Sequence, residues 1–364
     1  MLSRMLGGRG TLIPYAKHQL EDEDIEEVIR VLRGKSITQG EIIEVFEDEF
    51  RKSVGAKYAV AVSSGTAALH TALMAIGIRP GDEVIVPSMT FVATANVVKY
   101  MGGVPVFADI CERTLLIDPA DIERKITYKT KAIIPVDFAG QPVDYEWING
   151  IAKRYCLKVV ADACHSLGAS YMGKKVGTLV DLSCFSLHPS KLITSGEGGI
   201  ITTNSEENYR IMKAFRNHGR ENGDTIFLGY NYRMSDIQAG LCLNQIKRIP
   251  ELVLARQRLS SVYDKALDEL DIAKIVQEQN RTNARHIYII LTQHRDRFIE
   301  KLKEYKINTQ IHYRPVTLQS FYDMAGATPI AERIWKYLLT IPLYPSMSEY
   351  EQKLIIMALG EASR

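Results

Sequence analysis

The sequence predicts an α/β fold, in which a mostly parallel sheet is sandwiched by helices and followed by a smaller α+β C-terminal domain. Three observations support this prediction. At 364 residues the chain is longer than a single hydrophobic core usually grows. From Tyr58 to about Thr202 short apolar runs alternate with helical patterns, and after about Pro250 they give way to long charged helical stretches. We therefore expect a large domain over residues 1–248 and a small domain over residues 249–364.

Strands and helices are expected to alternate along the large domain. A strand at 58–62 leads to a helix from about Thr66, and a strand at 83–86 leads to a helix from about Phe91. The other expected elements are strands at 104–108, 131–136, 158–161, 182–186 and 199–202 and a helix near 144–155. Strands this apolar are typical of a parallel sheet that helices cover on both faces. Ligands bind such sheets at the carboxyl ends of the strands.

The pattern changes in the last third of the chain. A long charged helix is expected at 255–270, followed by a short strand at 287–291 and a helix at 297–305. We find no internal repeat and no linker rich in Gly, Pro or Ser. These features predict a small α+β domain that packs directly against the large one.

Composition and charge exclude several classes of function. The net charge is +2 with both signs interspersed, so a nucleic-acid partner is not expected. No apolar run approaches the roughly 20 residues that span a bilayer, and the segment 1–10 lacks the apolar stretch of a secretory signal. We therefore expect a cytoplasmic protein without a membrane partner. The 5 cysteines form no CxxC pair and are expected to be buried, reduced thiols, and no metal site is predicted.

Lys191 is the most informative single residue. It lies in the segment SLHPSK (186–191), after an expected strand and before the glycine-rich turn GEGG (196–199). A lone lysine in a loop is usually a solvated cation. At the end of a buried strand, however, desolvation would lower the pKa of the amine from about 10.4. The neutral amine is then available to form a Schiff base with an aldehyde and to move protons.

Asp162 follows the last apolar residues of another expected strand, in the segment VVADACHS (159–166). One interpretation is a helix N-cap, because aspartate is common before a helix. The other is an anion that pairs with a protonated cofactor nitrogen and keeps the ring electron-withdrawing. The segment alone leaves both interpretations open.

Two strand-to-helix junctions offer further candidates. In AVSSGTAAL (61–69), Ser64 and Thr66 are either helix caps or part of a phosphate site, since a helix N-terminus presents free amide groups and a positive dipole end. The sequence has no P-loop and no GxGxxG motif, which disfavours nucleotide hydrolysis and dinucleotide binding. In PSMTFVAT (87–94), Phe91 is either a core residue or a ring on which a flat heteroaromatic ligand stacks.

Together these motifs closely resemble those of the DegT-type sugar aminotransferases, a family of pyridoxal 5′-phosphate (PLP) enzymes with the aspartate-aminotransferase fold. The resemblance starts at IPY (13–15) and SITQG (36–40) and continues through SSGTAAL, GDEVIVPSMTFVATAN, FAGQPVD, the Lys191 segment and GYNYRMSDIQ (229–238). It ends with IHY (311–313) and IPLYP (341–345). Several long motifs in the same order cover nearly the whole chain.

The resemblance implies a role at the cofactor ring for four residues. Lys191 would be the Schiff-base lysine, which also moves the proton between the substrate carbon and C4′ of the cofactor. Asp162 would pair with the pyridinium nitrogen, and Phe91 would stack on the ring. His165 would lie against the ring near its phenolic oxygen.

The resemblance also implies how the cofactor phosphate is held. Gly65 and Thr66 would offer backbone donors to the phosphate, and Ser186 would offer its hydroxyl. Asn231 would reach in from the neighbouring subunit, so that the active site is complete only in a homodimer.

The implied reaction is a two-stage exchange, in which glutamate leaves its amino group on the cofactor and a keto sugar takes it up. FAGQP and HYRPVTLQ are most similar to motifs of enzymes that aminate C4 of UDP-linked 4-keto-6-deoxy N-acetylhexosamines. His312 and Tyr313 match positions that line the sugar pocket in relatives, or else are strand residues at a domain junction. The chain departs from the family pattern at Ala161, Leu187 and 192–193, which leaves the exact sugar open.

Two other functions compete with amination. A PLP-dependent sugar dehydratase of this family would carry histidine in place of Lys191, and a non-catalytic regulatory protein would be expected to lose Lys191 or Asp162. Both residues are present, which favours amination. Arg233 and Arg314 are either contacts to an anionic substrate group or interface salt bridges. The expected partners are therefore a nucleotide sugar, an amino-acid donor and a second copy of the chain.

Overall fold

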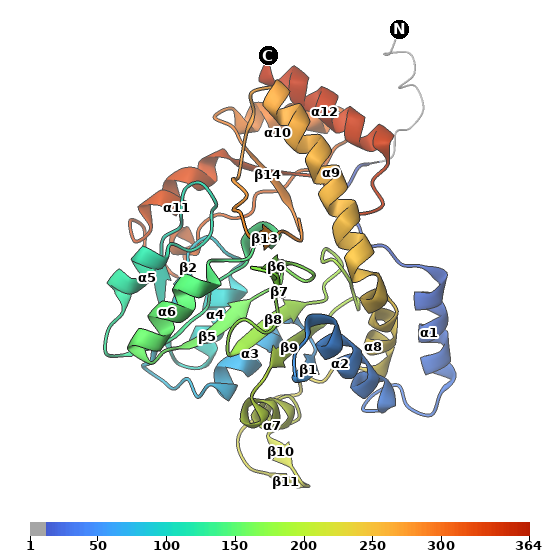
Figure 1. Ribbon diagram of the computed structural model, residues 1–364, viewed down its shortest axis with the longest axis vertical. Helices are drawn as coiled ribbons and strands as arrows, with labels where there is room; N and C mark the ends of the chain where they lie inside the picture. Colours follow the sequence, from blue (N-terminus) through green and yellow to red (C-terminus); the bar gives the residue numbers. More distant parts are fainter. Residues whose placement is uncertain (1–11) are drawn as a thin grey trace.

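A seven-stranded sheet forms the centre of the computed structural model, which describes residues 12–364 (Figure 1). The strand order is β1-β9-β8-β5-β4-β2-β3. β9 runs antiparallel to both of its neighbours, and the other four neighbouring pairs are parallel. The expected α/β fold with a mostly parallel sheet is therefore confirmed. The segment 1–10, which we expected not to be a secretory signal, lies outside the described residues.

The large sheet and its helices are built from the first two thirds of the chain. The strands are β1 (Tyr58–Val62), β2 (Glu83–Pro87), β3 (Val104–Ala108), β4 (Thr130–Ile133), β5 (Lys158–Asp162), β8 (Leu182–Ser186) and β9 (Gly199–Thr203). The helices are α1 (Asp22–Arg33), α2 (Glu41–Val54), α3 (Gly65–Ala75), α4 (Ala93–Tyr100), α5 (Pro119–Lys125), α6 (Tyr145–Tyr155), α7 (Glu206–Phe215) and α8 (Asp236–Leu243). Small two-residue strands complete this part: β6 (Ser170–Tyr171), β7 (Lys174–Lys175), β10 (Arg220–Glu221) and β11 (Asp224–Thr225).

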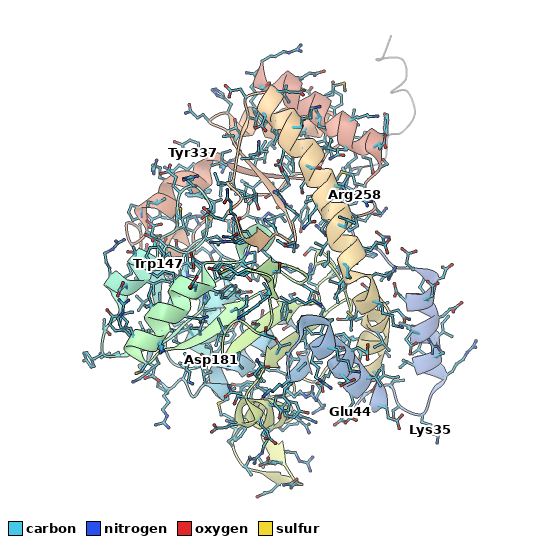
Figure 2. The ribbon with its side chains drawn as sticks, viewed as in Figure 1. Lys35, Glu44, Trp147, Asp181, Arg258 and Tyr337 are labelled. Atoms are coloured by element: carbon cyan, nitrogen blue, oxygen red, sulfur yellow. The ribbon has the colours of Figure 1, made fainter. Side chains whose placement is uncertain are left out.

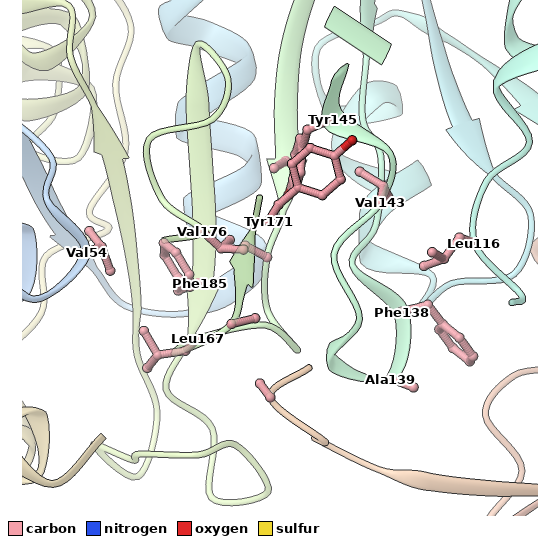
Figure 3. Close-up of a cluster of buried hydrophobic side chains, with 14 of the residues drawn as sticks. Val54, Leu116, Phe138, Ala139, Val143, Tyr145, Leu167, Tyr171, Val176 and Phe185 are labelled. Carbon is pink, nitrogen blue, oxygen red and sulfur yellow. The ribbon is translucent and has the colours of Figure 1, made fainter. Parts of the chain in front are cut away.

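Alternating side chains of the strands bury both faces of this sheet. In β2, Val84 and Val86 belong to one core cluster, which includes apolar residues of α3, α4 and α7, whereas Ile85 belongs to a second cluster, which includes residues of α2 and α6. Successive residues of a strand point to opposite faces, so each strand contributes to both cores. Figure 3 shows part of the cluster that contains Ile85, to which Val54, Phe138 and Phe185 contribute from separate segments.

The C-terminal third forms a smaller α+β unit around a three-stranded antiparallel sheet with the order β12-β14-β15. Its strands are β12 (Ala273–Lys274), β14 (Tyr288–Leu291) and β15 (Leu338–Ile341), and β13 (Arg281–Thr282) pairs with β6 of the large part. Its helices are α9 (Ile249–Glu269), α10 (Arg295–Glu304), α11 (Pro329–Ile334) and α12 (Glu349–Ser363). The boundary at residue 248 stays a prediction.

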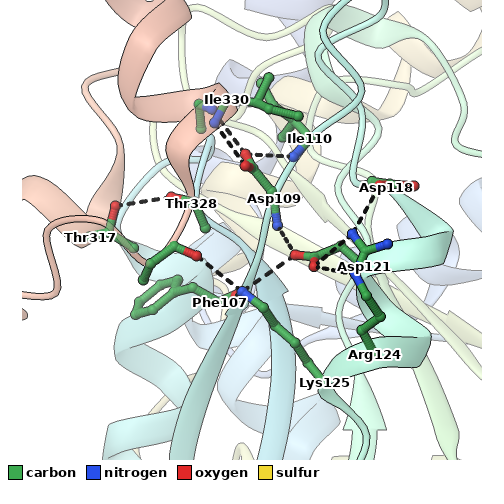
Figure 4. Close-up of polar contacts among 12 residues, drawn as sticks. Phe107, Asp109, Ile110, Asp118, Asp121, Arg124, Lys125, Thr317, Thr328 and Ile330 are labelled. Atoms are coloured by element: carbon green, nitrogen blue, oxygen red, sulfur yellow. Dashed lines mark hydrogen bonds and ion pairs between the residues drawn. The ribbon is translucent and has the colours of Figure 1, made fainter.

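Polar contacts join the C-terminal third to the edge of the large sheet (Figure 4). The buried carboxylate of Asp109, just after β3, accepts hydrogen bonds from the backbone of Ile330 at 2.8 Å and Ala331 at 2.9 Å, at the start of α11. Lys125 donates to the carbonyl oxygen of Ala327 at 3.1 Å. Earlier in the same segment, the backbone of Val316 donates to the carbonyl oxygen of Ser88 at 2.9 Å, so this part of the chain lies at the end of β2.

Several element predictions need correction. The helix expected at 255–270 begins six residues earlier, at Ile249, because Pro250 occupies the first turn, where proline is compatible with a helix. The strand expected at 131–136 ends at Ile133, two residues before Pro135. The expectation of buried thiols holds for Cys184 and Cys242 only, although all 5 cysteines are unpaired. Within residues 12–364, no helix combines the length and apolar character that crossing a membrane requires.

Candidate active site

A cavity of about 410 Å³ opens at the carboxyl ends of the parallel strands. Its walls include residues that directly follow β1, β2 and β4 and the last residues of β5 and β8. This is the edge at which open α/β sheets bind ligands. Nine of the ten predicted site residues line it: Gly65, Thr66, Phe91, Asp162, His165, Ser186, Lys191, His312 and Tyr313. The tenth, Asn231, does not line the cavity.

Lys191 presents its amine to this cavity from the loop after β8. Burial lowers the pKa of Lys191, whereas the nearby side chains of Cys164 and Asp162 raise it. The net direction is downward, so the fraction of neutral amine is larger than for a solvated lysine. A neutral amine is the form that attacks an aldehyde.

Asp162 is the last residue of β5 and is 5% exposed. No helix follows it in the chain, so the helix N-cap interpretation is wrong. Its Oδ2 accepts a hydrogen bond from Thr94 Oγ1 at 2.8 Å, and Thr94 in turn contacts Thr90 Oγ1 at 2.8 Å. Its Oδ1 accepts from the backbone of Cys164 at 3.2 Å. These bonds fix the carboxylate at the wall of the cavity.

The N-terminus of α3 forms another wall. Ser64 is its N-cap and accepts a hydrogen bond from the backbone of Ala67 at 3.0 Å, which confirms the capping role considered for this residue. The first turn carries no acidic side chain, so the amide groups and the positive end of the helix dipole favour an anion. A Cβ at Gly65 would lie 2.9 Å from Cβ of Ser186, so glycine is required for the close approach of α3 to β8.

Aromatic side chains line the mouth of the cavity. The ring of Phe91 is 57% exposed, which is unusual for a core residue and leaves a flat apolar face open. Its centroid lies 6.2 Å from that of Tyr313, whose hydroxyl lies 3.5 Å from Nε2 of His165. Nδ1 of His165 is buried without a hydrogen-bond partner among the described residues. Burial, followed by the charge of Lys191, lowers the pKa of His165 well below its usual value, so this imidazole is neutral.

One site residue, His286, could not be predicted from the sequence. Nε2 of His286 lies 3.5 Å from the amine of Lys191, and its ring centroid lies 4.2 Å from that of His165. Burial, and then the neighbouring His165, lower the pKa of His286 well below its usual value. His286 precedes β14, far along the chain from every motif discussed above, and a single histidine before a strand carries no distinguishing pattern.

Three predicted or considered residues lie elsewhere. Asn231 is exposed, and its backbone forms a bridge with that of Asn217. Arg233 donates to Oδ1 of Asn217 at 2.7 Å, and Arg314 donates to the carbonyl oxygen of Leu318 at 2.7 Å. Neither arginine lines the cavity or pairs with a carboxylate among residues 12–364. Within one copy of the chain these three residues are therefore outside the site.

The residues of the cavity fit PLP. A helix N-terminus free of acidic residues matches the phosphate, a fixed carboxylate matches a protonated ring nitrogen, and an exposed aromatic ring matches the flat face. The unpartnered Nδ1 of the buried His165 also leaves a polar atom available to a ligand. The amine of Lys191 is the group that an aldehyde needs.

Comparisons with known proteins agree with this geometry. The sequence profile of the DegT/DnrJ/EryC1/StrS aminotransferase family matches residues 18–360. The chain is 36% identical to the spore coat polysaccharide biosynthesis protein SpsC of Bacillus subtilis, with 98% of both chains covered. Spr1654 of Streptococcus pneumoniae, solved in a PLP form, has a TM-score of 0.92 and 30% identity, covering 97% of this chain and 99% of that one. Helicobacter pylori PseC, an aminotransferase involved in pseudoaminic acid biosynthesis, also has a TM-score of 0.92 and 30% identity, covering 97% of this chain and 99% of that one.

Proposed function

Because this chain belongs to the DegT/DnrJ/EryC1/StrS aminotransferase family, it is an aminotransferase that uses PLP, and we propose that its acceptor is a nucleotide-linked 4-keto-6-deoxy sugar. The amino group moves from L-glutamate to the keto carbon at C4 of this sugar. The relatives PseC and SpsC, which serve pseudoaminic acid and spore coat polysaccharide biosynthesis, support a sugar acceptor. The observation that carries the proposal is the amine of Lys191 in one cavity with the carboxylate of Asp162.

PLP supplies an aldehyde that receives the amino group and a ring that takes up the electron pair released when a proton leaves the substrate carbon. In the proposed mechanism Lys191 holds the cofactor at rest and, once displaced, removes the proton from Cα of glutamate. The same amine returns a proton to C4 of the sugar in the second half. Its lowered pKa supports both tasks, because a base works best when its pKa is close to the working pH.

The other cavity residues position the cofactor in this proposal. Asp162, held by Thr94, would pair with the ring nitrogen and keep it protonated. The N-terminal turn of α3, through Gly65 and Thr66, would bind the phosphate together with the hydroxyl of Ser186. Phe91 would offer a flat face for the ring to stack on.

His165, His312 and Tyr313 are proposed to act at the ring edge and at the sugar. His312 contacts Thr340 through Nδ1 at 2.8 Å, and burial lowers the pKa of His312 to about 4. The neutral imidazole therefore recognises the sugar by hydrogen bonding and not by charge. Dehydration is disfavoured because the dehydratases of this family carry histidine at the position of Lys191.

A homodimer with shared active sites completes the proposal. Asn231 is exposed and does not line the cavity of its own chain, as expected for a residue that acts in a partner. The segment before it also exposes large apolar side chains: Ile226 is 50% exposed and Leu228 is 80% exposed. Exposed apolar residues close together are typical of surfaces that another chain covers.

Absorbance spectra of the purified protein test the proposed reaction. The protein is loaded with PLP, treated with glutamate and then with UDP-, GDP- and dTDP-linked 4-keto-6-deoxy sugars. We expect glutamate to convert the visible band of bound PLP to the pyridoxamine form and one sugar to restore it. Lys191→Ala is expected to remove both changes, and Lys174→Ala, at an exposed lysine, is the control. The proposal would be refuted if glutamate left the visible band of bound PLP unchanged, or if the sugar product contained no newly added amino group.

Complementation tests the shared site. Lys191→Ala and Asn231→Ala chains are each expected to have low activity as homodimers. In a mixed dimer one site combines an intact Lys191 with an intact Asn231, so mixing is expected to restore activity. If mixed dimers form but stay as inactive as the parents, the shared site is wrong.

A further inference from the structure

Arg256, in the middle of α9, is a buried cation that the mechanism above leaves without a role. It is 1% exposed and is among the largest fully buried side chains of the protein. Its Nη1 donates to three backbone carbonyl oxygens, those of His286 at 2.7 Å, Leu343 at 3.1 Å and Arg285 at 3.3 Å. Nε has no hydrogen-bond partner within the described part of the chain.

No carboxylate in the described part of the chain neutralises this guanidinium. Arg256 takes part in no ion pair within residues 12–364, and all of its recorded acceptors are neutral carbonyl groups. Buried charges are normally paired, because removing an ion from water is costly. Burial lowers the pKa of Arg256 only to about 10, so the group remains charged at neutral pH. A full positive charge is therefore held inside the protein.

This charge lies directly behind Lys191. Arg256, Lys191 and His286 line the same small cavity of about 10 Å³, on the interior side of the active site. The N-terminal half of α9 packs closely on the loop that contains Gly168. Val253, one turn before Arg256 in α9, lies so near this loop that a Cβ at Gly168 would be only 2.6 Å from its side chain. Arg256 also binds the carbonyl of His286, whose ring contacts the amine of Lys191. The helix, the guanidinium and the amine are thus held in one packed unit.

We propose that Arg256 is a positioning residue for Lys191: its uncompensated charge disfavours protonation of the amine, and its hydrogen bonds hold His286 beside that amine. The inference rests on the proposed role of Lys191 as the cofactor lysine. The carbonyl dipoles stabilise the guanidinium locally, but they carry no net charge and cannot cancel its field at Lys191. Asp162 and Cys164 oppose the effect, and Arg256 reinforces the effect of burial.

Several ionisable groups line the two cavities that contain Lys191. They are Asp162 at the end of β5, Cys164 and His165 in the following turn, His188 and Glu197 from the loop between β8 and β9, His286 and Arg256 from the C-terminal third, and Tyr15, His312 and Tyr313. Burial holds the pKa of His165, His286 and His312 below its usual value, so these imidazoles are neutral near pH 7. Arg256 is then the one buried cation among these groups that acts on the amine within the described residues.

Competitive labelling of the apoenzyme tests the proposal. A trace of acetic anhydride is applied from neutral to alkaline pH, and the acetylation of each lysine is measured by mass spectrometry. Lys35, which projects into solvent in Figure 2, is the internal reference. We expect Lys191 of the wild-type protein to titrate below Lys35. Arg256→Met and Arg256→Gln are expected to raise the midpoint of Lys191 by on the order of one pH unit.

The control is Arg258→Met, which removes the same charge from the same helix at an exposed position (Figure 2). It is expected to leave the midpoint of Lys191 unchanged. If the Arg256 variants melt at lower temperature but titrate Lys191 as the wild type does, the role of Arg256 is structural and the proposal is wrong. The proposal is also wrong if Lys191 and Lys35 of the wild-type protein have the same labelling midpoint. This measurement needs no variant.

The proposed function can fail separately. Borohydride reduction of the PLP-loaded protein is expected to attach the cofactor to the peptide that carries Lys191. If PLP attaches to a different lysine, the proposed role of Lys191 is wrong, while the labelling experiment still measures the effect of Arg256 on the amine. If PLP attaches to Lys191 but the titration midpoint of Lys191 is the same in the wild type and the Arg256 variants, only the inference about Arg256 is wrong.

Discussion

The amine of Lys191 lies 3.5 Å from Nε2 of His286, although 95 residues separate them along the chain. The imidazole is buried against His165 and lacks a charge, since burial lowers its pKa well below the usual value. A neutral imidazole accepts or donates one hydrogen bond without repelling a cation. His286 is therefore placed to orient the amine in either protonation state.

Replacing His286 tests this orienting role. We expect His286→Phe to keep the fold and to slow the half-reaction with glutamate by on the order of 10-fold, which corresponds to about 1.4 kcal/mol. His286→Gln, which retains a hydrogen-bonding group, is expected to have a rate between that of the wild type and that of the Phe variant. Single-turnover absorbance measures the rate, and His294→Phe, at an exposed histidine, is the control. Equal rates for the Phe variant and the wild type would exclude an orienting role.

The hydrogen bond from Thr94 to Asp162 makes a prediction about cofactor affinity. Thr94→Val removes a donor to a buried carboxylate without changing the shape of the side chain. Because a hydrogen bond to a charged group contributes about 1.5 kcal/mol, we expect the Kd for PLP to rise by roughly 10-fold. Thr71→Val is the matched control, since the buried hydroxyl of Thr71 has no partner in the described chain. The prediction fails if both variants titrate with PLP alike.

The close approach at Gly65 makes a second prediction about affinity. In Gly65→Ala the new Cβ would lie 2.9 Å from Cβ of Ser186, so α3 must shift away from β8. We expect a Kd for PLP raised by on the order of 10-fold, because overpacking of this kind costs about 1–3 kcal/mol. Equilibrium titration of the apoenzyme measures it.

The control for this change is Gly150→Ala in α6, where a Cβ would meet no atom within 4 Å. Alanine is the better helix former, so this variant is expected to bind PLP normally and to gain up to about 1 kcal/mol of stability. A Gly65→Ala protein with wild-type affinity would show that α3 yields freely and that its position does not define the phosphate site.

Much of the large sheet could be predicted from the sequence because buried parallel strands have a strong apolar signal. The strand at 182–186 was predicted with the bounds that β8 has, and the site residues cluster because they follow strands whose carboxyl ends meet at one edge. Residues with two meanings limit such predictions. Pro250 marks a boundary in the sequence pattern, but proline also starts helices, and α9 begins at Ile249. For Asp162 the sequence leaves a helix cap and a cofactor partner open, and the structure excludes the cap.

What the sequence could not predict depends on contacts between distant segments. His286 and Arg256 belong to the C-terminal third, and only the folded chain brings them to the loop after β8. Neither residue lies in a motif with a chemical pattern. An arginine within a charged helix is normally solvated, so the full burial of Arg256 could not be predicted from its sequence context.

Asp137 makes a prediction about stability and pH. Its carboxylate is 1% exposed and accepts hydrogen bonds from Ser166 at 2.6 Å, Tyr145 at 2.7 Å and the backbone of Val143 at 2.8 Å. Burial raises the pKa of Asp137 to about 6, above the value near 3.9 of an unfolded chain. The folded state therefore binds this proton more tightly. The resulting stabilisation is complete below about pH 4 and is lost as the pH rises through about 6.

The comparison of the wild type with Asp137→Asn isolates this effect, because asparagine does not titrate. We expect the free energy of unfolding of the wild type, relative to the variant, to fall by about 2 kcal/mol between about pH 4 and pH 7. Urea unfolding at a series of pH values measures it, and Asp22→Asn, at an exposed aspartate, controls for the change in net charge. A difference that is constant with pH, or that grows as the pH rises, would mean that Asp137 is ionised in the folded protein throughout this range.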